Sequence, residues 1–142
     1  MLFKNVAIEA LAYELPPHRV TSAALEDQIA PTMERLGVKP GRIEELSGIR
    51  ERRFWDAGTQ PSDAATRAGR KAIEQAGIDP ARIGAVVNTS VTNAYTEPAT
   101  AVFVHRNLGL SQRCTNFDIR NACLGFINGI QTVGMLIEAG EI

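Results

Sequence analysis

Apolar and polar residues alternate along the first segment of the chain, from Phe3 to Tyr13. A period of two is typical of a β-strand, because successive side chains of a strand point to opposite faces. The proline pair Pro16-Pro17 is expected to end this strand. The apolar positions on one side of it are Val6, Ile8, Ala10 and Ala12.

The next segment changes to a helical period. Thr21-Ser22 can cap a helix whose apolar positions lie three or four residues apart. Pro31 lies inside this pattern and predicts a kink or two short helices, and Gly37 is expected to end it. The arginine-rich segment from Lys39 to Gln60 is expected to be a loop. The apolar positions of the helical pattern are Leu25, Ile29, Met33 and Leu36.

Predicted helices and strands alternate along the rest of the chain. Alanines at every fourth position predict a helix that can lie close against a sheet, and a last helix that is apolar nearly all round is expected to be buried between layers. Such alternation predicts an α/β fold with a mainly parallel sheet. The predicted elements are a helix from Ser62-Asp63 to Gly77, a strand from Ile83 to Asn88, a helix from Pro98 to Leu108, a strand from Cys114 to Ile119 and a helix from Cys123 to about Ala139.

Length and composition indicate an ordinary folded protein. The 142 residues are enough for one domain over 1–142 with a core of its own. The chain stops directly after a predicted helix, where a β-α series would begin its next strand, so we expect it to be the N-terminal part of a longer protein. With 15 basic and 16 acidic residues it gives no electrostatic reason to expect a nucleic-acid partner. Without an apolar run of about 18 residues or a secretory signal, we expect a cytoplasmic protein with no membrane insertion.

Cys123 is the candidate with the most distinctive local setting. It stands where a predicted strand turns into a predicted helix, beside backbone N–H groups that lack an intrahelical partner. These groups and the helix dipole favour the thiolate over the thiol, which is the nucleophilic form. The same position also suits a small buried hydrophobic residue, and the local pattern leaves both interpretations open. The other cysteine, Cys114, is expected in the core, and the two do not suggest a disulfide or a metal site.

Several motifs of the chain resemble those of one enzyme superfamily, the thiolase-superfamily condensing enzymes, on the 3-oxoacyl-ACP synthase III branch. The resemblance covers essentially the whole chain, and it is closer still to the branch of bacterial olefin biosynthesis that joins two fatty acyl-CoAs head to head. The motifs that carry it are Leu2-Phe3, Ser47 to Asp56, Ser62 to Thr66, Asn88 to Val91, Glu97-Pro98 and Asp118 to Gly129.

The resemblance implies a thiolase-like fold, of which this chain would be the N-terminal βαβαβ half with a buried nucleophile helix. It implies a homodimer in which Cys123 takes an acyl group from CoA as a thioester. A second acyl thioester then attacks that group in a Claisen condensation. The substrate would be an acyl-CoA or an acyl-ACP, with coenzyme A as part of the substrate rather than a bound cofactor, and with no metal.

The resemblance also implies roles for three other residues. Glu97 stands where the olefin branch has an acid that is read as the base for the second acyl chain; the alternative is an acid at a helix N-terminus. Arg50 and Arg52 could contact CoA phosphates, or they could form structural ion pairs with Glu51 or Asp56.

Some features of the family pattern are missing from these residues. The family's His and Asn lie in its second half, and neither His18 nor His105 is expected to replace that His, so the 142 residues alone are expected to be inactive. Two other functions stay open: a conventional 3-oxoacyl-ACP synthase III that uses malonyl-ACP, and a non-catalytic dimerisation or scaffold domain.

Overall fold

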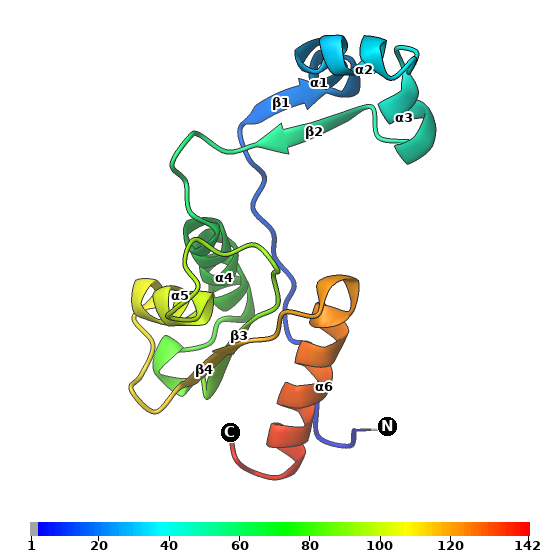
Figure 1. Ribbon diagram of the computed structural model, residues 1–142. Coiled ribbons are helices and arrows are strands. Elements are labelled where there is room, and N and C mark those ends of the chain that lie inside the picture. The colour runs from blue at the N-terminus through cyan, green and yellow to red at the C-terminus, as the bar shows by residue number, and fades with distance from the viewer. Residues whose placement is uncertain (1–2) are drawn as a thin grey trace. The chain divides into compact units, whose positions relative to one another are not determined.

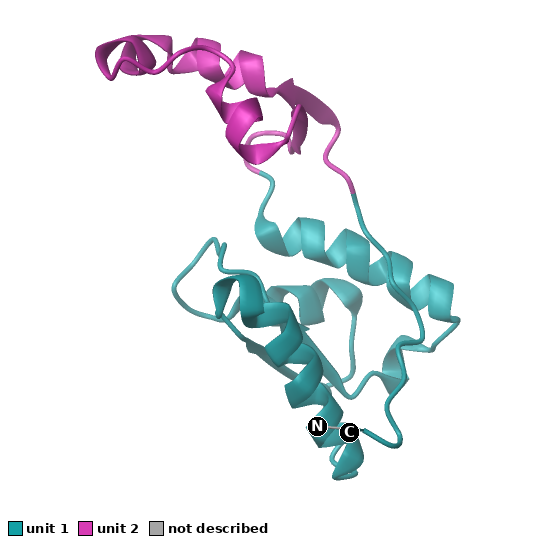
Figure 2. Ribbon diagram, turned by 90° about the vertical axis from the view of Figure 1, so that its right-hand side faces the viewer, with its two compact units in different colours: residues 1–14, 59–142 teal, residues 15–58 magenta. Residues whose placement is uncertain are grey.

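The computed structural model describes residues 3–142, so Leu2, which contributes to the resemblance, lies outside the described residues. The chain forms two compact units (Figure 2). One comprises residues 1–14 and 59–142, and the other comprises residues 15–58. The single domain expected for residues 1–142 stays a prediction.

The larger unit has the predicted α/β architecture. Strands β3 and β4 pair in parallel, with Ala85 opposite Thr115 and Asn88 opposite Asp118. In Figure 1, α4 and α5 lie on one side of these strands and α6 lies on the other. The elements of this unit are α4 (Pro61–Ala76), the short helix η1 (Pro80–Arg82), β3 (Ala85–Asn88), α5 (Thr100–Leu108), β4 (Thr115–Asp118), the short helix η2 (Ala122–Leu124) and α6 (Gly125–Glu138).

Helix α4 begins and ends where local chemistry dictates. The Gln60 N–H donates to the Asp63 carboxylate over 3.1 Å in a capping box, and Pro61 occupies the first turn, where its missing N–H costs nothing. Gly77 ends the helix with a φ of +65°, a conformation that favours glycine. The predicted helix is thus confirmed, and it packs chiefly against α5.

The core of the larger unit lies between α5 and the paired strands. Ala101 and Val104 of α5 are buried there, together with Leu110 and Cys114 from the connection to β4. Burial raises the pKa of the Cys114 thiol, since a thiolate would lose its hydration in the core. The prediction that Cys114 is a core residue is confirmed.

The predicted strand from Phe3 to Tyr13 is wrong. Residues 6–16 form neither helix nor strand, and Ile8, Leu11 and Tyr13 are exposed. A strand needs a neighbour that supplies hydrogen-bond partners along its edge, and no strand among the described residues pairs with this segment. Its start is held instead by Glu138 at the end of α6, whose Oε1 accepts the Lys4 and Asn5 N–H groups over 2.8 and 2.5 Å.

Helix α6 is buried on one side only within the described residues. Its glycines Gly125, Gly129 and Gly134 are buried, while Leu124, Phe126 and Ile127 around its start are 60, 57 and 59% exposed. The expectation of a helix covered on all sides therefore does not hold for the described part of the chain. The physical reason is that β3 and the N-terminal segment cover the glycine face of α6 and leave its other apolar side uncovered.

The smaller unit is a two-stranded antiparallel sheet with three short helices. Thr21 caps α1 by accepting the Ala24 N–H over 3.1 Å, and α1 and α2 are the two short helices that Pro31 predicts. The loop expected from Lys39 to Gln60 is wrong, because it contains α3 and β2. The elements of this unit are β1 (His18–Thr21), α1 (Ser22–Gln28), α2 (Ala30–Arg35), α3 (Arg42–Ser47) and β2 (Glu51–Phe54).

The missed elements of this unit depend on contacts between distant residues. Strand β2 is polar and lacks an apolar alternation, but it pairs with β1, and Arg19 donates to Glu51 across the two strands over 2.8 Å. Gly41 and Gly48 flank helix α3 as its N-cap and C-cap, both in the left-handed conformation. Buried Glu26 of α1 accepts the N–H groups of Gly41 and Ile43, over 2.5 and 2.7 Å.

The carboxylate of Glu26 should make the smaller unit sensitive to acid. The N–H groups of Ile43 and Gly41 lower the pKa of Glu26 against the opposing effect of desolvation. Its contribution to stability is therefore complete above the ordinary glutamate pKa of about 4.3, and it is lost as the pH falls through the lower pKa of the folded protein. Hydrogen exchange of the Gly41 and Ile43 amides should show less protection in Glu26→Gln near neutral pH, and a weaker loss of protection in acid than in the wild type. Glu34→Gln, which changes an exposed carboxylate, is the control; equal protection in both variants near neutral pH would contradict this role.

Candidate active site

The two predicted catalytic residues follow neighbouring strands of the parallel sheet. Asn88 and Asp118 are the last residues of β3 and β4 and lie opposite each other. The pairing continues for one more step, since the Ile119 N–H donates to the Asn88 carbonyl over 2.9 Å. Because parallel strands end at the same edge of a sheet, the segments that carry Glu97 and Cys123 both leave from this edge.

Cys123 is an exposed free thiol in the short helix η2, two residues before the start of α6. The predicted helix from Cys123 is therefore two residues too long at its start, because α6 begins at Gly125. The preceding residue, Ala122, has a φ of +42°, which is uncommon for a residue with a Cβ atom. Backbone strain of this kind is concentrated at functional sites, where the surrounding structure holds it in place.

Two glycines let α6 approach the end of β3 closely. A Cβ atom added at Gly125 would lie 2.8 Å from the Thr89 carbonyl oxygen and 3.2 Å from the Ile119 carbonyl oxygen. A Cβ atom added at Gly129 would lie 2.7 Å from the Thr89 methyl group. The sequence reasoning missed this contact, although the four-residue spacing of Gly125 and Gly129 within an apolar helix was a visible signal.

A side-chain hydrogen bond joins the cysteine turn, the segment between β4 and α6 that carries Cys123, to α6. The Asn121 Nδ2 donates to the Asn128 Oδ1 over 2.7 Å. Beside α6 lies an apolar hollow of about 330 Å³ whose lining includes Val87, Phe126 and Ile130. The helix that follows Cys123 thus offers apolar surface next to the exposed thiol.

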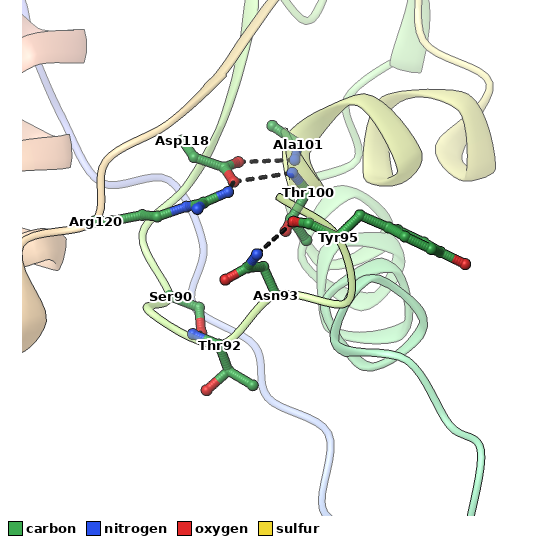
Figure 3. Close-up of polar contacts among 8 residues, drawn as sticks. All are labelled: Ser90, Thr92, Asn93, Tyr95, Thr100, Ala101, Asp118 and Arg120. Carbon is green, nitrogen blue, oxygen red and sulfur yellow. Dashed lines mark hydrogen bonds and ion pairs between the residues drawn. The ribbon is translucent and has the colours of Figure 1, made fainter. Parts of the chain in front are cut away.

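Glu97 lies on the loop between β3 and α5, which is held by its own contacts (Figure 3). The Asn93 amide donates to the Tyr95 carbonyl, and the Thr92 N–H donates to the Ser90 hydroxyl over 3.0 Å. The Tyr95 ring packs on Phe103 of α5, with ring centroids 5.6 Å apart.

The acid at the start of α5 is Asp118 rather than Glu97. Helix α5 begins at Thr100, so Glu97 lies outside its first turn. The Asp118 carboxylate accepts the N–H groups of Thr100 and Ala101, each over 2.9 Å, and Arg120 donates to it over 3.3 Å (Figure 3). Glu97 itself is exposed and makes no hydrogen bond or ion pair among residues 3–142. Its carboxylate is therefore available to a ligand or another chain.

The pKa of Asp118 reflects this set of donors. Partial burial raises the pKa of Asp118, but the hydrogen bonds from Ala101 and Thr100, and the neighbouring Arg120, outweigh that effect and lower it overall. Asp118 is therefore an ionised acceptor near neutral pH.

Arg50 and Arg52 belong to the smaller unit, and their predicted ion pairs do not form. Glu51 pairs with Arg19, and Asp56 pairs with His18 over 2.7 Å. Arg52 is half-buried and donates to the Ser22 hydroxyl over 3.4 Å, whereas the Arg50 side chain is exposed. A role in CoA binding stays a prediction for both.

Residues 3–142 contain neither a metal-binding group of acidic, histidine or cysteine side chains nor a membrane-spanning helix. No group of three or more His, Cys, Asp or Glu side chains is arranged to hold a metal ion there. None of the helices described is both long and apolar enough to span a bilayer.

The chain is similar over its whole length to known condensing enzymes, although no protein-family model matches it. It is 47% identical over 142 residues to an acyl-CoA:acyl-CoA alkyltransferase of Xanthomonas campestris, and 35% identical over 127 residues to a β-ketoacyl-[acyl-carrier-protein] synthase III of Rhodospirillum rubrum. The chain spans 42% of the length of the first relative and 37% of the second.

Solved structures match the fold as well as the sequence. Xanthomonas campestris OleA with bound cerulenin matches with a TM-score of 0.92 and 47% identity, over all of this chain and 42% of its own. A structure named 3-oxoacyl-(acyl carrier protein) synthase III, FabH, from Xanthomonas oryzae pv. oryzae matches with a TM-score of 0.94 and 48% identity, over all of this chain and 42% of its own. The thiolase-like fold predicted from the sequence is therefore confirmed.

The close approach of α6 to Thr89 should make Gly125 intolerant of a side chain. Gly125→Ala should lower the free energy of unfolding of the complete protein by about 1–3 kcal/mol, because a carbonyl oxygen of the backbone cannot move aside. Gly69→Ala in α4 is the control and should not lower stability in this way, since an added Cβ atom there meets only the end of the Leu108 side chain, 3.3 Å away. Urea unfolding measures both; a Gly125→Ala protein at least as stable as the wild type would contradict the contact.

Proposed function

We propose that this chain belongs to the thiolase-superfamily condensing enzymes, to whose sequences and fold it is similar. We further propose that its protein joins two fatty acyl-CoAs head to head. The product is a β-ketoacyl-CoA, and one coenzyme A is released. The observation that carries the proposal is the edge of the sheet from which the Cys123 turn and the Glu97 loop both leave. The alkyltransferase name of the relative that is 47% identical supports the same reaction.

In the first step the Cys123 thiolate attacks the carbonyl carbon of an acyl-CoA. A new bond forms between Cys123 Sγ and the acyl carbon, and the bond from that carbon to the CoA sulfur breaks. Coenzyme A leaves as its thiolate and takes up a proton. Backbone N–H groups of the short helix η2, that of Cys123 among them, are suited to stabilise the oxyanion that forms on the way.

In the second step Glu97 removes a proton from the α-carbon of a second acyl-CoA. The resulting enolate attacks the acyl group on Cys123, a carbon–carbon bond forms, and the Cys123 thiolate is released. The unpaired Glu97 carboxylate is free to accept that proton, whereas the oxygens of Asp118 already accept N–H groups.

Further parts of the proposal rest on the resemblance. The protein acts in the cytoplasm as a homodimer, with coenzyme A as part of the substrate and no bound cofactor. Of the two predicted arginines, Arg50 is the stronger candidate for a contact with a CoA phosphate, because its side chain is exposed while Arg52 donates to Ser22.

A conventional synthase III is the second candidate. The FabH-named structure that is 48% identical favours it. The two differ in the second substrate, because a conventional synthase III requires malonyl-ACP. Formation of a β-keto product from long-chain acyl-CoA alone supports the head-to-head reaction, and an absolute requirement for malonyl-ACP supports the alternative.

Acylation of Cys123 tests the first step. The complete protein, incubated with myristoyl-CoA, should gain the mass of one acyl group, and peptide mapping should place it on Cys123. Cys123→Ala should gain none, while Cys114→Ala, which removes the buried thiol, should be acylated as in the wild type. Unchanged acylation of Cys123→Ala would overturn the assignment.

Glu97→Gln tests the second step. Acylation of Cys123 should continue, while condensation should fall by at least about 10²-fold, because a general base contributes that much or more. Both steps are followed by mass spectrometry of the protein and of the product. Glu74→Gln on α4 is the control for loss of a surface carboxylate, and normal condensation by Glu97→Gln would remove the base from the mechanism.

A further inference from the structure

We propose that Asp118 is a positioning residue for the condensation step, which holds the loop that carries Glu97 against the strand that leads to Cys123. The inference rests on the proposed roles of Glu97 and Cys123. It assigns to Asp118 no contact with substrate, and it concerns only the step in which the second acyl chain reacts.

The first link joins β4 to α5. The two oxygens of Asp118 accept from two successive N–H groups, Oδ2 from Thr100 and Oδ1 from Ala101, each over 2.9 Å. Two bonds from one rigid, planar group fix both the position and the direction of the start of α5. Ala101 is fully buried and Thr100 nearly so, so little water competes for these donors.

The second link joins α5 to Glu97. The Tyr95 ring lies on Phe103 of α5, and the Tyr95 carbonyl accepts from Asn93 of the same loop. In the chain, Glu97 thus stands between Tyr95, which contacts α5, and Thr100, which donates to Asp118. A shift of the start of α5 would therefore move Glu97 with it.

The third link joins Asp118 to Cys123. Asp118 is the last residue of β4 and lies opposite Asn88, and only four residues separate it from Cys123. Arg120, in that connection, donates to the same carboxylate over 3.3 Å. The Asp118 carboxylate is therefore hydrogen-bonded both to α5, the helix that follows Glu97, and to Arg120 in the connection that leads to Cys123.

The charge of the side chain matters as well as its shape. Both N–H groups of α5 need an acceptor, and a carboxylate offers one on each side. In Asp118→Asn, one acceptor becomes an NH₂ group that faces an N–H donor, so one of the two bonds is lost at nearly constant size. The start of α5 is then held by a single bond.

The test separates the two steps of the reaction in the complete protein with myristoyl-CoA. In Asp118→Asn, Cys123 should be acylated at a rate close to that of the wild type. The acyl group should then be lost to water more often, so that the ratio of β-keto product to free fatty acid falls about tenfold to a hundredfold. A merely structural role would lower both products in proportion to the folded fraction and leave this ratio unchanged.

Two further variants make the test independent of one substitution. Thr100→Pro removes one of the two donors while Asp118 stays intact. Proline is well tolerated at the first helical position, and the ψ of Ala99, 146°, is within the range favoured by a residue that precedes proline. It should lower the ratio in the same direction. Asp79→Asn is the control, because Asp79 caps the short helix η1 by accepting the Ala81 N–H over 2.9 Å, and it should leave the ratio unchanged.

The outcomes distinguish this inference from the proposed function. If the wild type acylates Cys123 and condenses, and both Asp118→Asn and Thr100→Pro keep the wild-type ratio, the positioning role is wrong and the proposed function stands. If the wild type forms no β-keto product from acyl-CoA, the proposed function itself is wrong. A lowered ratio in both variants, with the control unchanged, supports the inference.

Discussion

The parallel pairing of β3 with β4 is the constraint on which the candidate site depends. With Asn88 opposite Asp118, both strands end at the same edge of the sheet. The loop that carries Glu97 and the turn that carries Cys123 therefore both begin at this edge. A slip of one residue would turn the side chains of β4 to the opposite faces and remove Asp118 from the start of α5. The close contact of Gly125 with Thr89 depends on the same register, because Thr89 directly follows β3. Sheet, helix and site therefore form one unit.

The two acids at this edge illustrate how surroundings divide chemical roles. Both carboxylate oxygens of Asp118 accept N–H groups of α5, and the pKa of Asp118 is lowered. Asp118 is therefore a structural acceptor and a poor base. Glu97, a few residues before the same helix, is exposed and free of such bonds within residues 3–142. An exposed carboxylate without hydrogen bonds is better suited to accept a proton than one whose two oxygens already accept N–H groups. The sequence left open whether Glu97 is the acid at the N-terminus of a helix. In the structure that acid is Asp118.

The sequence predicted the features that local chemistry controls. Neighbours in the chain determine Gly77 at the end of α4, the two short helices around Pro31 and the apolar strand β3. The start of α4 was predicted one residue late, because its N-cap is Gln60 and the helix begins at Pro61. The failures depend on distant contacts: the segment from Phe3 to Tyr13 alternates like a strand but has no strand beside it in the described residues, and polar β2 forms because β1 lies next to it. In the site, the cysteine turn could be predicted from its strand–helix setting. The hydrogen bonds of Thr100 and Ala101 to Asp118 could not be predicted, since these residues lie 18 and 17 positions before Asp118 in the chain.

The most direct test of the account is a crystal structure of the complete protein after reaction with a long-chain acyl-CoA. If Cys123 and Glu97 have the proposed roles, the acyl chain will lie on Cys123 Sγ, and its carbonyl oxygen will accept the Cys123 N–H. A Glu97 carboxylate will then face the space where the second acyl chain must approach. Asp118 should keep its bonds to Thr100 and Ala101 in that state. An acyl chain bound at another residue would contradict the role of Cys123. A Glu97 carboxylate that faces solvent rather than the acyl group on a cysteine, in every copy of the protein, would contradict its role as the base.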